Sequence, residues 1–455
     1  MSKRLIIIAL AALFVLLAGP TDLPMAPQAH VVTVSEPGGH YTEPGLAINP
    51  KDPRQVVAVF QGGKRVQGTA TALYSTDGGL TFAAGKGTDS AGWRVLGDVT
   101  TAFDNKGNVY LCSIAFDHLG TSGYWAHNVH RNGIIVRRSQ DGGKTWQPAV
   151  SNVQTFTHDD DRNIQFEDEP RIFADNNPAS PYAGSLYVGW VEWQLTQSVM
   201  YFSRSKDQAK TWSTPLRIST RAGLPRDDNG GLGGYHQAIA ADGAIYAIWD
   251  DAASIVMTTS HDGGASFAPS RPIVPIGPPY FGDVPGVARV EGFPQIAIER
   301  RRGGKLFVCW SDYSNGDVDV FVAASVDQGR TWGRPLRVND DPIHNGIDQF
   351  YQWMALDPIT GAIYVDFYDR RGDADSNKAR VTLARSTDGG RSFRNYAWTT
   401  APFNPLGAFL GDYTWIDAYN NHVVAAWTET ETAATRASAT TVIKVGSADF
   451  THAAP

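Results

Sequence analysis

The sequence predicts an all-β protein folded as a propeller of seven four-stranded antiparallel blades. Short runs rich in Val, Ile, Tyr and Trp alternate with glycine-containing turns along the 455 residues, and long stretches of helical period are missing. An eight-residue pattern, "STDGGLTF" at 75–82, returns five more times at intervals of roughly 55 to 66 residues. That interval suits one four-stranded blade per copy.

Seven pairs of strand-like runs give the number of blades. The first run of each pair, expected to be the innermost strand, stands at 45–49, 99–104, 170–175, 236–242, 294–299, 352–357 and 414–419, and the second at 56–61, 109–114, 186–192, 245–251, 306–312, 363–369 and 423–429. The seventh unit ends at "GSAD" without a copy of the pattern, while "HVVTVSE" at 30–36 is left over before the first unit. We expect this spare segment to complete the seventh blade and close the ring, which removes an exposed sheet edge.

The repeated pattern is expected to be structural rather than catalytic. Its Asp can bond the backbone of its own tight turn, its Gly adopts angles denied to other residues, and its final Trp or Phe packs between sheets. The third copy has Ala209 at a glycine position, so that turn is expected to be distorted or strained. The aspartates of the six copies are Asp77, Asp141, Asp207, Asp262, Asp327 and Asp388.

These six copies resemble the Asp-box (BNR) repeats of the sialidase superfamily, and the resemblance covers nearly the whole chain after its N-terminal segment. It implies a propeller and, for an active member, a pocket opposite the boxes with an arginine cluster, a Tyr/Glu nucleophile pair and an Asp acid/base. Sialidases of this superfamily are six-bladed and begin the first blade with an Arg-Ile-Pro-like segment, where this chain has "EPGLAIN". A six-bladed propeller is therefore the alternative, and the whole catalytic set is not carried over.

The N-terminus predicts export. Lys3 and Arg4 precede an apolar run, Leu5–Ala18, of the length of a signal-peptide core. We expect residues 1–29 to be a signal peptide or an N-terminal anchor and 30–455 to be the propeller, in a secreted or periplasmic protein. The net charge of −7, with no stripe of Lys or Arg, argues against a nucleic-acid partner. No cofactor and no metal site are expected.

Acidic side chains end the second strand in five blades and should form a rim at the channel mouth. Each carboxylate could cap its own loop, but paired carboxylates at such a mouth are also what glycoside hydrolysis requires. The five acids are Glu192, Asp251, Asp312, Asp369 and Glu429.

Blade six departs most from its siblings. Asp366 takes a position that is Val, Cys, Gly, Ile, Cys or Ala in the other repeats, and a carboxylate on an apolar face is costly unless paired or protonated. Arg370 or Arg371, or a residue of the next blade, is the expected partner. An interblade ion pair and a functional carboxylate with a shifted pKa remain open as alternatives.

The residues that begin the innermost strands supply the remaining site candidates. They are Glu43, Asp98, Glu169, His236, Tyr351 and Asp412 with Tyr413. Arg171 is the one Arg at its repeat position, and its planar fork suits a substrate carboxylate. A salt bridge to Glu167, Asp168 or Glu169 is the plain alternative.

A long insertion at 117–133 leaves blade two on the same end of the propeller. It contains three histidines, and Trp125, with Tyr124, could stack on a sugar ring. Metal binding by His127 and His130 is the alternative.

The leading interpretation is an exported sialidase-like glycoside hydrolase that acts on an acidic glycan. Asp369, Asp366, Glu169, Tyr351 and Tyr413 are the catalytic candidates, and Arg171, Arg370, Arg371, His236, Asp412 and Trp125 are the substrate-binding candidates. One alternative is a noncatalytic propeller that binds a glycan or a protein partner. The other is a uronate polysaccharide lyase, in which His236 or Tyr351 abstracts a proton beside a uronate held by Arg171.

Overall fold

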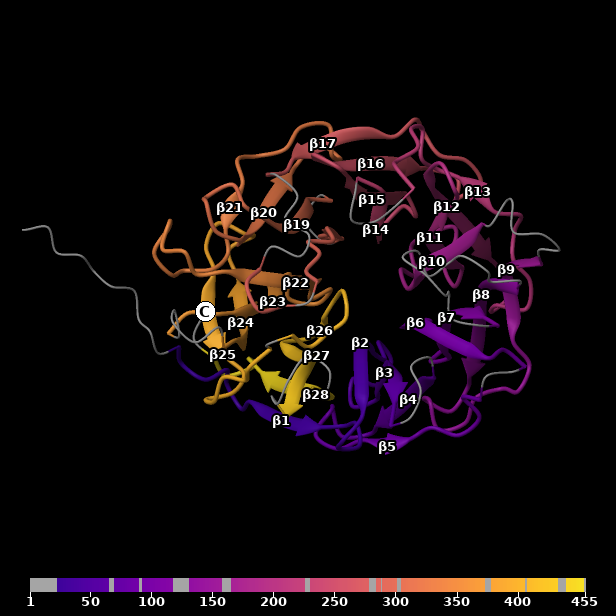
Figure 1. Cartoon of the computed structure of the whole chain (residues 1–455). Helices are drawn as coiled ribbons and strands as arrows, with labels where there is room; N and C mark the ends of the chain where they lie inside the picture. Colours follow the sequence, from indigo (N-terminus) through magenta and orange to yellow (C-terminus); the bar gives the residue numbers. More distant parts are fainter. Residues whose placement is uncertain are drawn as a thin grey trace, which may run out of the picture.

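The computed structural model is a closed ring of β-sheets (Figure 1). It describes residues 23–64, 69–89, 92–117, 131–157, 165–225, 230–277, 284–287, 289–300, 304–372, 378–405, 407–432 and 439–453. These residues contain β-strands and no helix, and so no helix among them could cross a membrane.

Seven sheets of four antiparallel strands form the blades, ordered from the axis outward. Blade 1 is β2 (His40–Ile48), β3 (Val56–Gly63), β4 (Ala70–Ser75) and β5 (Ala83–Ala84); blade 2 is β6 (Val95–Phe103), β7 (Val109–Phe116), β8 (Arg131–Ser139) and β9 (Ser151–Thr157). Blade 3 is β10 (Phe166–Ala174), β11 (Leu186–Trp193), β12 (Ser198–Ser205) and β13 (Leu216–Arg217); blade 4 is β14 (Leu232–Ile239), β15 (Ile245–Asp251), β16 (Ser254–Ser260) and β17 (Arg271–Pro275). Blade 5 is β18 (Gln295–Ile298), β19 (Leu306–Asp312), β20 (Asp319–Ser325) and β21 (Leu336–Arg337); blade 6 is β22 (Gln349–Leu356), β23 (Ile363–Asp369), β24 (Arg380–Ser386) and β25 (Arg394–Ala397). Blade 7 is β26 (Trp415–Tyr419), β27 (His422–Thr432), β28 (Thr440–Asp449) and β1 (His30–Thr33).

The ring closes with strands from the two ends of the chain, as the sequence predicts. β1 pairs antiparallel with β28, from His30 opposite Ser447 to Thr33 opposite Lys444. Figure 1 shows this junction where the indigo strand lies beside the yellow one. The seven-bladed prediction is confirmed, and the six-bladed alternative is wrong.

The second-strand position that Asp366 holds is equivalent in all seven blades, as the sequence alignment predicts. In every blade it lies opposite the matching residue of the first strand: Gly45 and Val59, Thr100 and Cys112, Arg171 and Gly189, His236 and Ile248, Gln295 and Cys309, Trp353 and Asp366, Trp415 and Ala426. Asp366 therefore does occupy a position that is otherwise small or apolar.

The repeated turns connect the third strand of a blade to its fourth, so they mark one end of the propeller. Asp77 accepts hydrogen bonds from the backbone of Leu80 and Thr81, and the Gly79 N–H donates to Ser75 Oγ at 2.9 Å. The third copy keeps this geometry, because the Ala209 N–H donates to Ser205 Oγ at 3.0 Å. Ala209 does so with φ of 62°, so its turn is strained but not distorted.

A short segment before β1 also packs on the propeller. The Ala397 N–H donates to the Pro24 carbonyl at 2.9 Å, and the Ala26 N–H donates to the Ala397 carbonyl at 3.0 Å. Ala26 is 3% exposed and belongs to the core. The chain thus contacts blade 6 before it enters blade 7, ahead of the expected boundary at residue 30.

Candidate functional site

One irregularity recurs in the innermost strands of five blades. The pairing of the first two strands is interrupted by a β-bulge at the same place in blades 1, 2, 3, 4 and 6. The first bulge residue has a left-handed backbone in each: Glu43 (φ 54°), Asp98 (φ 45°), Glu169 (φ 51°), Gly234 (φ 67°) and Tyr351 (φ 52°). We call these five residues the bulge ring. Four of them are not glycine, and backbone strain of this kind concentrates at functional sites.

Side chains of four blades meet near the axis, at the position two residues after the bulge in blades 3, 4 and 6 and at the matching position of blade 7. Trp353 of blade 6 stacks on Trp415 of blade 7, with ring centroids 4.6 Å apart. His236 of blade 4 reaches Trp353 at 5.7 Å, and the Arg171 guanidinium of blade 3 lies 5.3 Å from the same ring. Arg171 thus crosses the ring toward blades 6 and 7.

Arg171 occupies an aromatic cage. Its guanidinium carbon lies 3.8 Å from the Tyr413 ring centroid and 5.6 Å from that of Trp415. The side chain is fully buried, yet none of its three nitrogen atoms has a hydrogen-bond partner. The expected alternative, a salt bridge to a neighbouring acid of its own strand, is therefore not formed. A buried fork of unused donors is costly, and an anionic group would satisfy it.

Carboxyl groups of blades 1 to 3 are linked next to this cage. The Glu169 N–H donates to Asp98 Oδ2 at 3.2 Å, and Glu169 Oε2 accepts the Gly234 N–H at 2.7 Å. Gln61 bridges the other side, because its amide donates to the Glu43 carboxyl and its oxygen accepts the Asp98 N–H at 2.9 Å. The bulges therefore bring Glu43, Asp98 and Glu169 into one cluster.

Burial changes the protonation of this cluster. Burial raises the pKa of Glu169 to about 8, with Asp98 and Asp412 adding to the increase and the Gly234 N–H and Arg171 opposing it. Burial, then Asp98, raises the pKa of Glu43 well above its usual value, and the pKa of Asp168 rises for the same two reasons. Asp98 is half-buried. The cluster thus holds several carboxyl groups in the protonated form near neutral pH.

His236 is neutral at the axis. Burial, reinforced by Arg171, lowers its pKa to about 3. Its Nδ1 accepts the Ile296 N–H at 3.3 Å. The neutral imidazole therefore carries its proton on Nε2, which can donate a hydrogen bond, and it has no charge at neutral pH.

Arg289 sits between the bulge ring and the start of blade 7. Its Nε donates to Asp412 Oδ1 at 2.6 Å and lies 3.6 Å from Glu291. The Tyr351 hydroxyl donates to the Arg289 carbonyl. Tyr351 and Asp412 therefore lie at the cluster, but both are engaged with this arginine.

Two of the predicted arginines lie in ion pairs of blade 6. The Arg371 Nε is 2.6 Å from Asp369 Oδ2, and Arg371 also pairs with Asp340. Arg370 lies 3.7 Å from Asp348 and donates to the Pro285 carbonyl. The contacts of Asp369, Arg370 and Arg371 are thus separate from those of the Arg171 cage.

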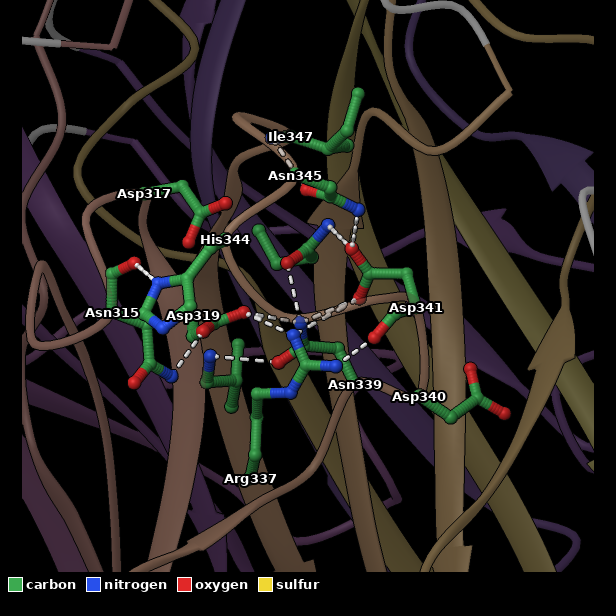
Figure 2. Close-up of polar contacts among 12 residues, drawn as sticks. Asn315, Asp317, Asp319, Arg337, Asn339, Asp340, Asp341, His344, Asn345 and Ile347 are labelled. Atoms are coloured by element: carbon green, nitrogen blue, oxygen red, sulfur yellow. Dashed lines mark hydrogen bonds and ion pairs between the residues drawn. The ribbon is translucent and has the colours of Figure 1, made fainter. Parts of the chain in front are cut away.

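Figure 2 shows the polar network beside the Arg371–Asp369 ion pair. Arg337 is 3.0 Å from Asp319, and the Asn339 amide donates to Asp319 and Asp341 at 2.6 and 2.7 Å. Gln349 joins the network to Asp369, with its amide nitrogen 3.3 Å from Asp369 Oδ1. Within the described part of the chain, no group of three or more His, Cys, Asp and Glu is placed to hold a metal ion. The network therefore ties the segment before β22 to blade 5.

Asp366 has no partner. It is fully buried, neither carboxyl oxygen has a hydrogen bond, and burial raises its pKa. The expectation that Arg370 or Arg371 pairs with it is wrong, because those arginines bind Asp348 and Asp369 instead. Opposite Trp353 and without a hydrogen bond, the Asp366 carboxyl is more stable in its protonated, uncharged form.

The structure thus brings together Glu169, Arg171, His236, Tyr351, Asp412 and Tyr413, and it places Asp369, Arg370 and Arg371 elsewhere. Trp125 and the histidines of its insertion lie outside the described residues. The sequence reading did not single out Trp353, Trp415 and Arg289 as site residues. The signal for the two tryptophans was their repeat position, which is the position that Arg171 and His236 hold in blades 3 and 4. Nothing in the pattern marks Arg289.

Comparisons with known proteins agree with the fold. No protein-family model matches the chain, and no curated protein matches it. Among solved structures, the phage phi92 endosialidase is similar at 9% identity, over 93% of this chain and 69% of its own, with a TM-score of 0.50. The GH93 α-L-arabinofuranosidase of Fusarium graminearum is 12% identical over 79% of this chain and 97% of its own (TM-score 0.48). A Dyadobacter fermentans protein of unknown function is 13% identical over 92% and 97% (TM-score 0.47). At 9% identity, the likeness to the endosialidase shows a similar fold and no more.

Proposed function

We propose that this protein is a glycoside hydrolase that acts on an acidic glycan at the cluster formed by the bulge ring and Arg171. The observation that carries the proposal is the fully buried Arg171 guanidinium, whose donors are all unused although the Glu169 and Asp98 carboxyl groups are near enough to act on it electrostatically. The raised pKa of Glu169, about 8, keeps that carboxyl protonated at neutral pH, so it does not neutralise the arginine. A carboxylate of the substrate would supply the missing acceptor.

Glu169 is the acid in this proposal. Its raised pKa, about 8, keeps a proton on the carboxyl at neutral pH, and the Gly234 N–H fixes its orientation. The proton passes to the glycosidic oxygen as the bond to the anomeric carbon breaks. Asp98, half-buried and adjacent, is the second carboxylate: it takes a proton from the water molecule whose oxygen bonds to that carbon, which completes the hydrolysis.

The cage residues position the sugar. Tyr413 packs against the guanidinium, whose carbon lies 3.8 Å from the centre of its ring. The Tyr413 hydroxyl is buried without a hydrogen-bond partner, so it too can meet a substrate oxygen. Export through the N-terminal segment would place this activity outside the cytoplasm.

The test is turnover of defined glycans by the wild type and by Arg171→Met. Sialosides and uronate oligosaccharides are the acidic substrates, and neutral arabino-oligosaccharides are the comparison. We expect the wild type to release sugar from an acidic substrate and the variant to lose that activity while its melting temperature stays level or rises, because an unpaired buried charge has been removed. No turnover of any acidic glycan by the wild type, or a variant that unfolds, would make Arg171 a structural residue.

A further inference from the structure

A cavity lies on the opposite end of the propeller from the bulge ring. It has a volume of about 380 Å³, which is within the range of small-ligand sites. Its wall is formed by the β26–β27 hairpin of blade 7, the end of β28 and the repeated turn of blade 1. Both the hairpin and that turn lie at the end where the first strands finish, so this cavity shares no residue with the cluster around Arg171.

The cavity exists because blade 7 is closed by strands from both chain ends. In the other six blades the third strand runs into a repeated turn that leads to the fourth strand. Here β28 continues to Asp449, where the Thr451 N–H donates to Asp449 Oδ1 at 2.7 Å and no such turn forms. The hollow lies at the place where the seventh turn would begin.

The hairpin presents its groups in a fixed geometry. Asn420 and Asn421 both have positive φ, 53° and 68°, as a two-residue type I′ turn requires. The Asp357 carboxylate of blade 6 accepts both of their backbone N–H groups, at 2.9 and 2.7 Å. Tyr419 and His422, which flank the turn, are therefore held on the cavity wall.

The chemistry of the wall is that of a sugar site. Tyr419 offers a half-buried aromatic ring, and Asn420 an exposed amide. His422 is uncharged at neutral pH because burial lowers its pKa, and its Nε2 is buried without a hydrogen-bond partner. The Asp449 carboxylate, half-buried, completes the set. One aromatic face with several planar hydrogen-bonding groups suits the apolar face and the hydroxyls of a pyranose or furanose ring.

The charged side chains around the cavity indicate which class of ligand it can bind. Arg54, on the rim, is paired with Asp52 at 3.0 Å, so its charge is already compensated. Asp77 and Asp449 both keep a pKa below the usual value and are ionised at neutral pH. Two carboxylates disfavour an anion, so a neutral sugar fits better than a uronate or a phosphate.

We propose that this cavity, the blade 7–1 pocket, is a noncatalytic binding site for a neutral sugar residue. It does not depend on the function proposed for the opposite end. A glycan held there would tether the protein to a polymer while leaving the bulge ring free.

Binding is measured by titrating the full protein with neutral arabino-, xylo- and malto-hexaose and, separately, with sialyllactose. Tyr419→Ala is expected to weaken binding of one neutral hexaose by roughly tenfold or more, since it removes the ring platform. Tyr182→Ala is the matched control, because Tyr182 lies beside the repeated turn of blade 4, at the same end of the molecule but away from the pocket. Its binding should equal that of the wild type.

The proposal is overturned if no neutral hexaose binds the wild type, or if Tyr419→Ala and Tyr182→Ala bind it equally well. It is also overturned if only sialyllactose binding responds to Tyr419→Ala. Hydrolysis is followed in parallel, so that the loss of the function proposed for Arg171 and Glu169 is seen separately from the loss of this pocket.

Discussion

Several side chains near the axis are both titratable or charged and buried, among them Glu169, Arg171 and His236. Glu169 and Asp168 lie in the same strand as Arg171, yet the arginine pairs with neither. The bulge between Asp168 and Arg171 interrupts the regular alternation of side chains in this strand. The sequence could mark Arg171 by its repeat position, but not the aromatic cage, which comes from blades 6 and 7. Arg370 and Arg371 are likewise suited to bind a substrate carboxylate. They directly follow β23, however, and pair with Asp348, Asp340 and Asp369 instead.

The buried carboxyl groups predict that the protein loses stability above neutral pH. A carboxyl whose pKa is higher in the folded state stabilises fully below its unfolded pKa, and this contribution is lost as the pH rises through the folded pKa. This loss begins near the unfolded pKa of about 4 and is complete at the folded pKa, about 7 for Asp250 and about 8 for Glu169, so its last part falls between pH 6.5 and 8.5. We expect a lower melting temperature at pH 8.5 than at pH 6.5, measured by calorimetry.

Glu169→Gln is the check on that assignment, since glutamine cannot lose a proton. Its melting temperature should fall less between the two pH values than that of the wild type. His236, whose pKa is lowered to about 3, acts in the opposite direction, but only below its unfolded pKa near 6.5. A melting temperature that rises from pH 6.5 to 8.5 would contradict the buried acid cluster.

At the level of elements, the repeated turns join each blade to the one before it. The glycine in the second position of a turn has positive φ and faces the preceding blade: a Cβ on Gly79 would meet Val424, and one on Gly264 would overlap the Phe202 ring. The sequence predicted the turns and their structural role from composition and spacing. It could not show that Ala209 keeps the normal geometry, because that depends on how neighbouring blades pack.

Gly264→Ala should therefore destabilise the protein more than a glycine change with the same backbone. Gly346 is the control: its φ is 74° against 78° for Gly264, and no atom lies within 4 Å of a Cβ placed on it. Both variants carry the cost of a left-handed alanine, about 1 kcal/mol, but only Gly264→Ala adds the overlap, worth about 1–3 kcal/mol. Equal shifts in melting temperature for the two variants would show that the turn does not pack against blade 3 as described.

For the whole molecule, seven blades and their closure could be predicted because each unit repeats the same order of strands. The same alignment correctly placed the second-strand position that Asp366 shares with Val59, Cys112 and their equivalents. The bulges did not follow, because an extra residue in a strand is not visible in hydrophobic alternation. The parts of the candidate site that could not be predicted from the sequence are the contacts across the axis between distant blades.

Closure of the ring extends beyond β1, and this can be measured. A chain beginning at residue 30 lacks the hydrogen bonds of Pro24 and Ala26 with Ala397, that of Pro27 with Asp449, and the buried Ala26 side chain, all of which a chain beginning at residue 23 retains. We expect the shorter chain to melt a few degrees lower, since these three backbone hydrogen bonds and one buried methyl are lost. Identical melting curves would mean that this segment contributes nothing to closure.

The central claim is that the acid cluster around Arg171 cleaves glycans, and one pair of variants tests it most directly. Glu169→Gln and Glu167→Gln replace acids two positions apart in β10; both are buried with raised pKa, but Glu167 faces Glu192 across the sheet of blade 3. The measurement is kcat/KM on whichever acidic glycan the wild type cleaves. The account predicts a loss of roughly a hundredfold or more for Glu169→Gln and little change for Glu167→Gln. Equal activity of the two variants would contradict it.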